Sequence, residues 1–212
     1  MIWTKRFLFL HLPKTAGMSL TNLLTNKSVD PVFYTCPEQE AHGASAVHVI
    51  GNRHEALLEA EAYFSRFKQS VLDFEKIFVV MRNPYDFELS RFHYLQKGHS
   101  WDAGVAQDIA MKGSFRDFLE FAPFYGRLPP RLDAYFEVLG ETPPNLVVLR
   151  FERLQEDLDT HLSRFLKSTD LEHMNRSVHA PFEEEYDAET EDLCHRRHRW
   201  FFDKGFYSRI RF

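Results

Sequence analysis

The chain has 212 residues, 44% hydrophobic and 15% aromatic, which is enough to bury a full core and suits a single domain spanning 1–212. Its formal net charge of -5 excludes the overall basic field that nucleic-acid binding uses. Two cysteines, Cys36 and Cys194, are too few for a disulfide framework or a cysteine-built metal site. No apolar run reaches the roughly 20 residues of a membrane span, so we expect a soluble, cytoplasmic protein.

Three short apolar runs bounded by turn residues predict buried strands. They are RFLFLHL (6–12), KIFVVM (76–81) and NLVVLRF (145–151). A helical pattern follows each run: a leucine spacing from Leu20 to Leu24, a segment that starts with Pro84, and an apolar stripe from Leu154 to Leu166. A strand followed by a helix, three times, predicts an α/β fold with a central parallel sheet flanked by helices.

Other patterns predict further helices. Asn52 with Glu55 indicates the start of a helix over 53–69, and Ser114 with Asp117 marks a short helix. The Pro- and Gly-rich part at 123–144 is mainly connection, with room for a helix at 131–139. The tail from Asp187 to Lys204 predicts a helix that stops at Gly205.

Ligands of open parallel sheets bind beyond the carboxyl ends of the strands, so we expect the chemistry at 11–19 and 82–90. The first stretch contains PKTAGMS, where a strand hands over to a helix. Unpaired N–H groups at a helix start attract anions. The small residues Ala16 and Gly17 would let a ligand approach the backbone. Thr15 and Ser19 add hydroxyls, and Lys14 adds positive charge. An ordinary tight turn with a surface lysine is the alternative. The pattern is not a Walker A loop, whose lysine follows the last glycine.

The second stretch, FVVMRNPYDFELSRFHYL, places Arg82 directly after a predicted strand and Ser90 about two turns into the next helix. Arg82 can form paired hydrogen bonds to a phosphate, and Ser90 can bond another of its oxygens. Pairing of Arg82 with Asp86 across the helix start is the alternative. Two anion sites at neighbouring strand ends suit a ligand with two separated anionic groups.

These residues carry a family resemblance. HLPKTAGMSL resembles the 5′-phosphosulfate loop of sulfotransferases that use 3′-phosphoadenosine 5′-phosphosulfate (PAPS), in the carbohydrate and heparan sulfate 2-O-sulfotransferase-like branch. VVMRNPYDFELSRFHYL is similar to that branch's 3′-phosphate motif, VVLRFERL to a further family segment, and the stretch from His173 to Tyr207 to its C-terminal end. Residues 98–144 have no counterpart in this likeness.

The resemblance implies a P-loop-like three-layer fold and transfer of a sulfuryl group from PAPS to a hydroxyl acceptor, such as a carbohydrate or another small molecule. It implies that Lys14 stabilises the departing oxygen and that a loop holds the 5′-phosphate with residues Lys14, Thr15, Ala16, Gly17, Met18 and Ser19. Arg82 and Ser90 would hold the 3′-phosphate, with Arg176 or Ser177 as a further contact. Adenosine 3′,5′-bisphosphate would be the second product, and no metal is needed.

The acceptor hydroxyl needs a general base, and the resemblance places a histidine between the two motifs, in a His-Ala-Ser/Thr-Ala stretch before a helix. This chain reads EAHGASAVHVI, so Gly43 separates His42 from Ala44. His42 is the preferred base, with His48 and Glu40 as alternatives. His11 is interpreted as structural or as a weak ligand contact.

Two other functions fit the sequence less well. A nucleoside triphosphate-dependent kinase on a P-loop-like fold would need its lysine elsewhere and a strand ending in a magnesium-binding aspartate. A non-catalytic nucleotide-binding domain would keep the pocket without turnover. The sequence decides neither the identity of the acceptor nor the oligomeric state.

Overall fold

The computed structural model describes residues 1–38, 46–124, 132–138, 140–172 and 181–210. The chain divides into two compact units, and the first is Met1–Arg82 with Ala134–Arg176. The second unit is Asn83–Asp133 with Ser177–Phe212. This division leaves the prediction of a single domain untested. None of the described helices is both long enough and apolar enough to cross a lipid bilayer.

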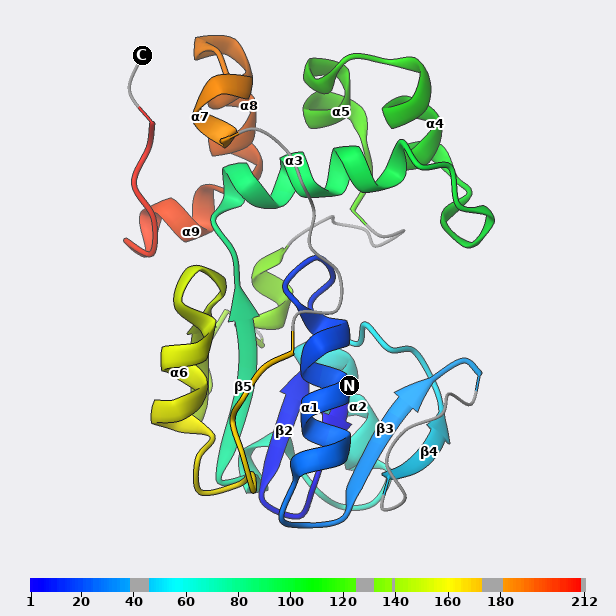
Figure 1. The fold of residues 1–212 in the computed structure, drawn as a ribbon, viewed down its shortest axis with the longest axis vertical. Helices are drawn as coiled ribbons and strands as arrows, with labels where there is room; N and C mark the ends of the chain where they lie inside the picture. Colours follow the sequence, from blue (N-terminus) through cyan, green and yellow to red (C-terminus); the bar gives the residue numbers. More distant parts are fainter. Residues whose placement is uncertain (39–45, 125–131, 139, 173–180, 211–212) are drawn as a thin grey trace. The chain divides into compact units, whose positions relative to one another are not determined.

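The first unit is built on a mixed sheet with the strand order β4-β3-β1-β2-β5-β6 (Figure 1). The strands are β1 (Ile2–Trp3), β2 (Phe7–Leu10), β3 (Val32–Cys36), β4 (Ala46–Ile50), β5 (Lys76–Met81) and β6 (Leu146–Arg150). The predicted strands at 6–12, 76–81 and 145–151 are confirmed as β2, β5 and β6, and three further strands join them.

The predicted parallel sheet is mixed rather than purely parallel, because β1 runs antiparallel to both β2 and β3. The other pairings, β2 with β5, β3 with β4 and β5 with β6, are parallel. The reason is the length of the connection, because β1 and β2 are joined by only Thr4, Lys5 and Arg6. A parallel crossover needs a dozen or more residues, whereas this short link closes a hairpin in which the Thr4 N–H donates to Phe7 O at 2.9 Å.

Helices cover both faces of this sheet. Phe9 and Phe78 are paired across β2 and β5, and their side chains join a core with α1 (Gly17–Lys27) and α6 (Leu154–His161). Side chains alternate along a strand, so Trp3 faces the other way, and its ring lies 5.7 Å from that of Phe64 on α2 (Leu57–Ser65). Figure 1 shows α1 in front of the sheet and α2 behind it. The predicted α/β class, a sheet flanked by helices, is confirmed in this unit.

The helix predicted over 53–69 begins later than expected. Its N-cap is Ala56, whose N–H donates to Glu59 Oε2 at 2.6 Å. Asn52 instead accepts a hydrogen bond from the His54 N–H at 2.9 Å, which makes a turn within the loop. Residues 52–56 therefore remain a loop, and His54 lies in it.

The 3₁₀ turns and the helices of the second unit complete the chain. The turns are η1 (Val71–Asp73), η2 (Ser100–Asp102), η3 (Leu132–Tyr135) and η4 (Phe151–Arg153). The helices are α3 (Pro84–Leu95), α4 (Val105–Lys112), α5 (Phe115–Phe121), α7 (Phe182–Glu185), α8 (Ala188–Arg197) and α9 (Arg199–Asp203).

The sequence located some of these helices better than others. Pro84 at the start of α3 and Ser114 as the cap of α5 are confirmed. Only a single 3₁₀ turn forms in the described part of 131–139. The helix predicted from Asp187 to Lys204 is interrupted at His198, which separates α8 from α9. The ring of His198 is buried against Glu88, so a tertiary contact accompanies the break that helix propensity did not indicate.

A buried charge cluster holds the second unit together around Glu88, whose side chain has no exposed area. Its carboxylate contacts Arg91 at 3.1 Å, Arg197 at 2.8 Å and His198 Nε2 at 2.7 Å. Burial alone would raise the pKa of Glu88, but Arg197, Arg91 and His198 hold it well below its usual range. Burial lowers the pKa of His198 and outweighs the raising effect of Glu88. The cluster thus keeps a carboxylate ionised in the core.

We expect Glu88→Gln to lower the free energy of unfolding by about 3–5 kcal/mol, because the substitution leaves two buried guanidinium groups without their counter-charge. The depressed pKa of Glu88 means that its stabilisation is present above its unfolded pKa of 4.5 and is lost as the pH falls through the folded value. The loss of unfolding free energy at acid pH should therefore be smaller in the variant than in wild type. Urea unfolding measures both effects, with Glu120→Gln as control, since Glu120 is exposed and pairs with Arg116 at 3.2 Å. Equal losses in the two variants would contradict the cluster's role.

Candidate functional site

The loop between β2 and α1, which carries the first motif, has an unusual backbone. Lys14 has φ 64° and Ala16 has φ 59°, both in the left-handed region that side chains other than glycine rarely adopt. Among the described residues other than glycine, Lys68 is the third with a positive φ. Such conformations cost of order 1–3 kcal/mol each and are common at ligand-binding sites. The loop is therefore held in a strained form where the sequence predicted the chemistry.

Threonine side chains support this loop from within. Thr15 is fully buried, and its hydroxyl donates to Leu12 O at 2.7 Å. Thr21, one turn into α1, donates to Gly17 O at 2.8 Å. The Thr15 hydroxyl, which the sequence offered as a phosphate ligand, thus has a hydrogen bond that closes the turn.

The N-terminus of α1 is suited to an anion. Its N-cap, Ala16, provides no side-chain hydrogen bond, and the first turn contains no acidic residue. The N–H of Leu20 donates to Ala16 O at 3.0 Å, and the N–H groups of the residues before it in the first turn point out of the end of the helix. Half-buried Lys14 adds positive charge beside them. Together they form an electropositive end to the helix.

The second motif reaches this loop through Arg82. Strands β2 and β5 are parallel with Leu10 opposite Val79, so their carboxyl ends lie side by side. Arg82 Nη1 donates to Lys14 O at 3.0 Å, and the guanidinium lies 4.4 Å from the centre of the Phe151 ring, which follows β6. The prediction that the two motifs meet at neighbouring strand ends is confirmed for Lys14 and Arg82. Their binding of phosphate groups remains a prediction.

The remaining predicted site residues are distributed differently. Ser90 lies on α3 in the second unit and is 1% exposed. His42, Glu40, Arg176 and Ser177 lie outside the described residues, so their roles remain predictions. No group of three or more His, Cys, Asp or Glu side chains that could hold a metal ion occurs in the described ranges.

His11 directly follows β2 and packs beneath the loop. It is 4% exposed, and a Cβ atom built at Gly17 would lie only 1.6 Å from its Nε2. Gly17 is therefore required by the imidazole ring, which occupies the space that the sequence analysis reserved for an approaching ligand. Burial lowers the pKa of His11 well below its usual value, and His54 and Arg53 lower it further. The ring is thus neutral at pH 7.

His54 is the site residue that the sequence analysis missed. Its Nδ1 lies 2.9 Å from His11 O, and its ring centre is 4.6 Å from that of His11. A carbonyl oxygen only accepts hydrogen bonds, so Nδ1 is the protonated nitrogen and Nε2 is the basic one in the neutral ring. Tyr135 donates its hydroxyl to His54 O at 2.7 Å. The capping pattern of Asn52 and Glu55 placed His54 inside a predicted helix, although a Gly51-Asn52 pair is also typical of a turn.

His48, one of the predicted alternatives for the base, lies elsewhere. It belongs to β4, the edge strand, and its Nε2 lies 2.9 Å from Cys36 O. Strand β4 is three strand spacings from β2, which is roughly 14 Å at about 4.8 Å for each spacing. His54 is therefore better placed than His48 to act beside Lys14.

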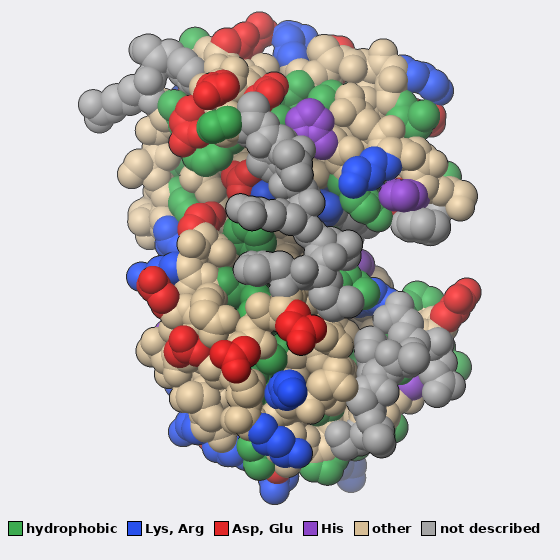
Figure 2. All heavy atoms as spheres, in the orientation of Figure 1, with side chains coloured by type: hydrophobic (Ala, Val, Ile, Leu, Met, Phe, Trp, Pro, Cys, Tyr) green, Lys and Arg blue, Asp and Glu red, His purple; other side chains and the backbone are tan. Residues whose placement is uncertain are grey.

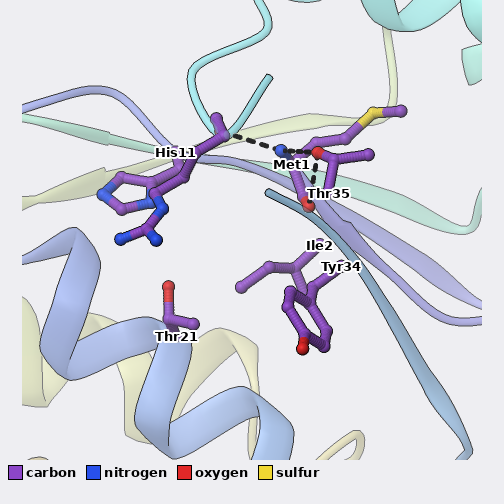
Figure 3. A pocket seen from close by; sticks show the side chains of 7 residues that line it. Met1, Ile2, His11, Thr21, Tyr34 and Thr35 are labelled. Atoms are coloured by element: carbon purple, nitrogen blue, oxygen red, sulfur yellow. Dashed lines mark hydrogen bonds between the residues drawn. The ribbon is translucent and has the colours of Figure 1, made fainter. Parts of the chain in front are cut away.

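A cavity of about 10 Å³ lies under the site, with His11 of the β2 end and Thr21 of α1 on its walls (Figure 3). Its other lining residues are Met1, Ile2, Tyr34, Thr35 and Arg53. This volume holds about one water molecule and cannot admit a nucleotide. A ligand of the loop must therefore bind on its outer side.

A larger groove of about 320 Å³ lies at the other end of the strands, with Lys76, His161 and Arg164 among its lining residues. Figure 2 shows Lys and Arg side chains at this end of the first unit. Arg164 pairs with Glu75 at 3.0 Å. His161 is in the last turn of α6, where the helix dipole favours cations. These contacts give the basic groups a structural role.

Searches with family models, against curated proteins and against solved structures return no match to this chain.

We expect Gly17→Ala to lower the free energy of unfolding by about 1–3 kcal/mol, since its methyl group would overlap the His11 ring. The double variant His11→Ala/Gly17→Ala removes the obstacle. Its loss of unfolding free energy should therefore be at least about 1 kcal/mol smaller than the sum of the losses in the two single variants. Chemical denaturation of wild type, both single variants and the double variant measures this coupling. Additive losses would contradict the contact.

Proposed function

We propose that the chain is a sulfotransferase that moves a sulfuryl group from PAPS to a hydroxyl acceptor, such as a carbohydrate, on a P-loop-like fold. The observation that carries the proposal is the hydrogen bond from Arg82 to Lys14 O. It joins the two motifs that resemble the donor-binding motifs of this family. The likeness in sequence and the contact in the structure both support one shared donor site.

The residues around Lys14 and Arg82 fit a donor with two anionic groups. The N–H groups of residues 17–19 and the Lys14 ammonium would hold the 5′-phosphosulfate, and no carboxylate in the first turn of α1 opposes it. Arg82 would hold the 3′-phosphate. Gly17 serves by fitting His11 beneath the loop, rather than by making room for the ligand.

The chemistry would need few covalent participants. The acceptor oxygen forms a bond to sulfur while the bond from sulfur to the bridging phosphate oxygen breaks, and adenosine 3′,5′-bisphosphate leaves. Lys14 would stabilise the negative charge that grows on the bridging oxygen, which by analogy with phosphoryl transfer is the main demand on the protein. The acceptor's proton would pass to a base.

We assign this base role to His54 within the proposal. Its Nε2 is the basic nitrogen, and its ring and Nδ1 are held by His11. His11 precedes the loop from Lys14 to Ser19, which would hold the donor and is called the donor loop below. His42 and Glu40 stay as predicted alternatives outside the described residues. A general base contributes a factor of about 10²–10⁴ to such a step.

Two assays test the function. Adenosine 3′,5′-bisphosphate without magnesium should raise the melting temperature, and a mass-detected transfer screen over glycans, lipids and small alcohols should find a sulfated product. Lys14→Ala should abolish transfer, whereas Lys27→Ala, at the exposed far end of α1, should not. Stabilisation only by ATP with magnesium would favour a kinase. Nucleotide binding without any transfer would favour a non-catalytic domain.

We expect Arg82→Ala to weaken binding of adenosine 3′,5′-bisphosphate by about 10- to 100-fold, the effect of losing a charged hydrogen bond of about 1.5–3 kcal/mol. Binding of adenosine 5′-monophosphate should change much less. The variant should therefore lose the preference for the nucleotide that carries a 3′-phosphate. Calorimetry of both nucleotides measures this difference. Arg153→Ala is the control, since Arg153 is 62% exposed and pairs with Asp157. A wild type that binds both nucleotides equally would refute the assignment.

We expect His54→Ala to lower kcat by about 10²–10⁴ while the affinity for adenosine 3′,5′-bisphosphate stays near that of wild type. His48→Ala should leave kcat unchanged because β4 lies across the sheet. Steady-state kinetics of both variants and of His42→Ala decide among the candidates. Loss of kcat in His42→Ala but not in His54→Ala would move the base to His42.

A further inference from the structure

We propose that His11 is a positioning residue that mechanically couples the donor loop to the base, His54. This inference rests on the proposed function. From the sequence alone, His11 was interpreted as structural or as a weak ligand contact. In the structure its ring contacts Gly17 of the loop on one side and the His54 ring on the other.

The His11 ring packs tightly against the loop. The space of a Cβ atom at Gly17 is filled by three ring atoms of His11, Nε2, Cδ2 and Cε1, at 1.6, 2.0 and 2.6 Å. Gly17 is also the first residue of α1, and its carbonyl accepts the Thr21 hydroxyl. Any movement of the His11 ring toward α1 must therefore shift the N–H groups that would bind the donor.

The contact with the base is equally close. The rings of His11 and His54 meet edge to face, with 4.6 Å between centres and 73° between planes. The backbone of His11 also accepts the hydrogen bond of His54 Nδ1, which fixes the direction of Nε2. Tyr135 holds the backbone of His54 from a different segment. His54 is thus fixed to His11 at two points.

The identity of residue 11 argues for more than packing. Its Nδ1 is buried and has no hydrogen-bond partner among the described residues, which is a cost that an apolar side chain would avoid. Burial lowers the pKa of His11, so the ring stays neutral and adds no positive charge beside His54. A planar ring can touch both groups at once, one on each of its sides.

The first test needs neither ligand nor turnover. Proton–nitrogen NMR of the imidazole rings should show that Gly17→Ala, which displaces the His11 ring, shifts the resonances of His54. The same spectra of Phe7→Leu are the control, because Phe7 is a buried ring on β2 that packs on Phe78 and Phe165. Unchanged His54 resonances in Gly17→Ala would overturn the proposal, whatever the enzyme assays give.

The second test uses the reaction. His11→Ala should lower kcat at least tenfold at a temperature where all variants are folded, and His11→Ala/His54→Ala should lose no more than His54→Ala alone, within about twofold. Phe7→Leu should lower the melting temperature and leave kcat unchanged. The coupling would be overturned if the fold-loss of kcat in the double variant equalled the product of the two single fold-losses. An unchanged kcat in His11→Ala would also overturn it. If wild type transfers no sulfuryl group, the proposed function fails, and the NMR result still decides the role of His11.

Discussion

The hydrogen bond from Arg82 to Lys14 O is the interaction on which the candidate site depends. It forms because β2 and β5 are parallel neighbours, so that the residues after both strands lie at one edge of the sheet. An arginine so placed supports the Lys14 backbone in a left-handed conformation that costs free energy. The same guanidinium stacks on Phe151, which brings the end of β6 into the arrangement. The segments that follow three strands therefore meet around the Arg82 guanidinium.

The loop between β2 and α1 is supported from below as well as from the side. His11 fills the space under Gly17, and Thr15 closes the turn onto Leu12. Loops that keep strained residues need such support, because unsupported backbone would relax to ordinary angles. The support accounts for the small size of the cavity below, about 10 Å³, since side chains occupy most of that space. A loop supported in this way presents its N–H groups in fixed directions.

The second motif divides its residues between two tasks. Arg82 belongs to the first unit and reaches the donor loop. Glu88 and Arg91, two turns further along α3, form the ionised cluster at the centre of the second unit. Tyr85 of the same helix packs on Tyr186, whose hydroxyl donates to Tyr85 O at 3.0 Å. A motif read as binding chemistry thus also carries the residues that stabilise a helical unit.

The sequence by itself determined the parts of the protein that rest on local patterns. Apolar runs located β2, β5 and β6, and Pro84 and Ser114 marked helix starts, because strand periodicity and capping act over a few residues. Only the tertiary structure decided the direction of β1, the break at His198 and the place of His54, since each depends on contacts between distant segments. His54 is the clearest case: the capping pattern of Asn52 and Glu55 favoured a helix there, and contacts with His11 and Tyr135 hold it in a loop beside the strand end.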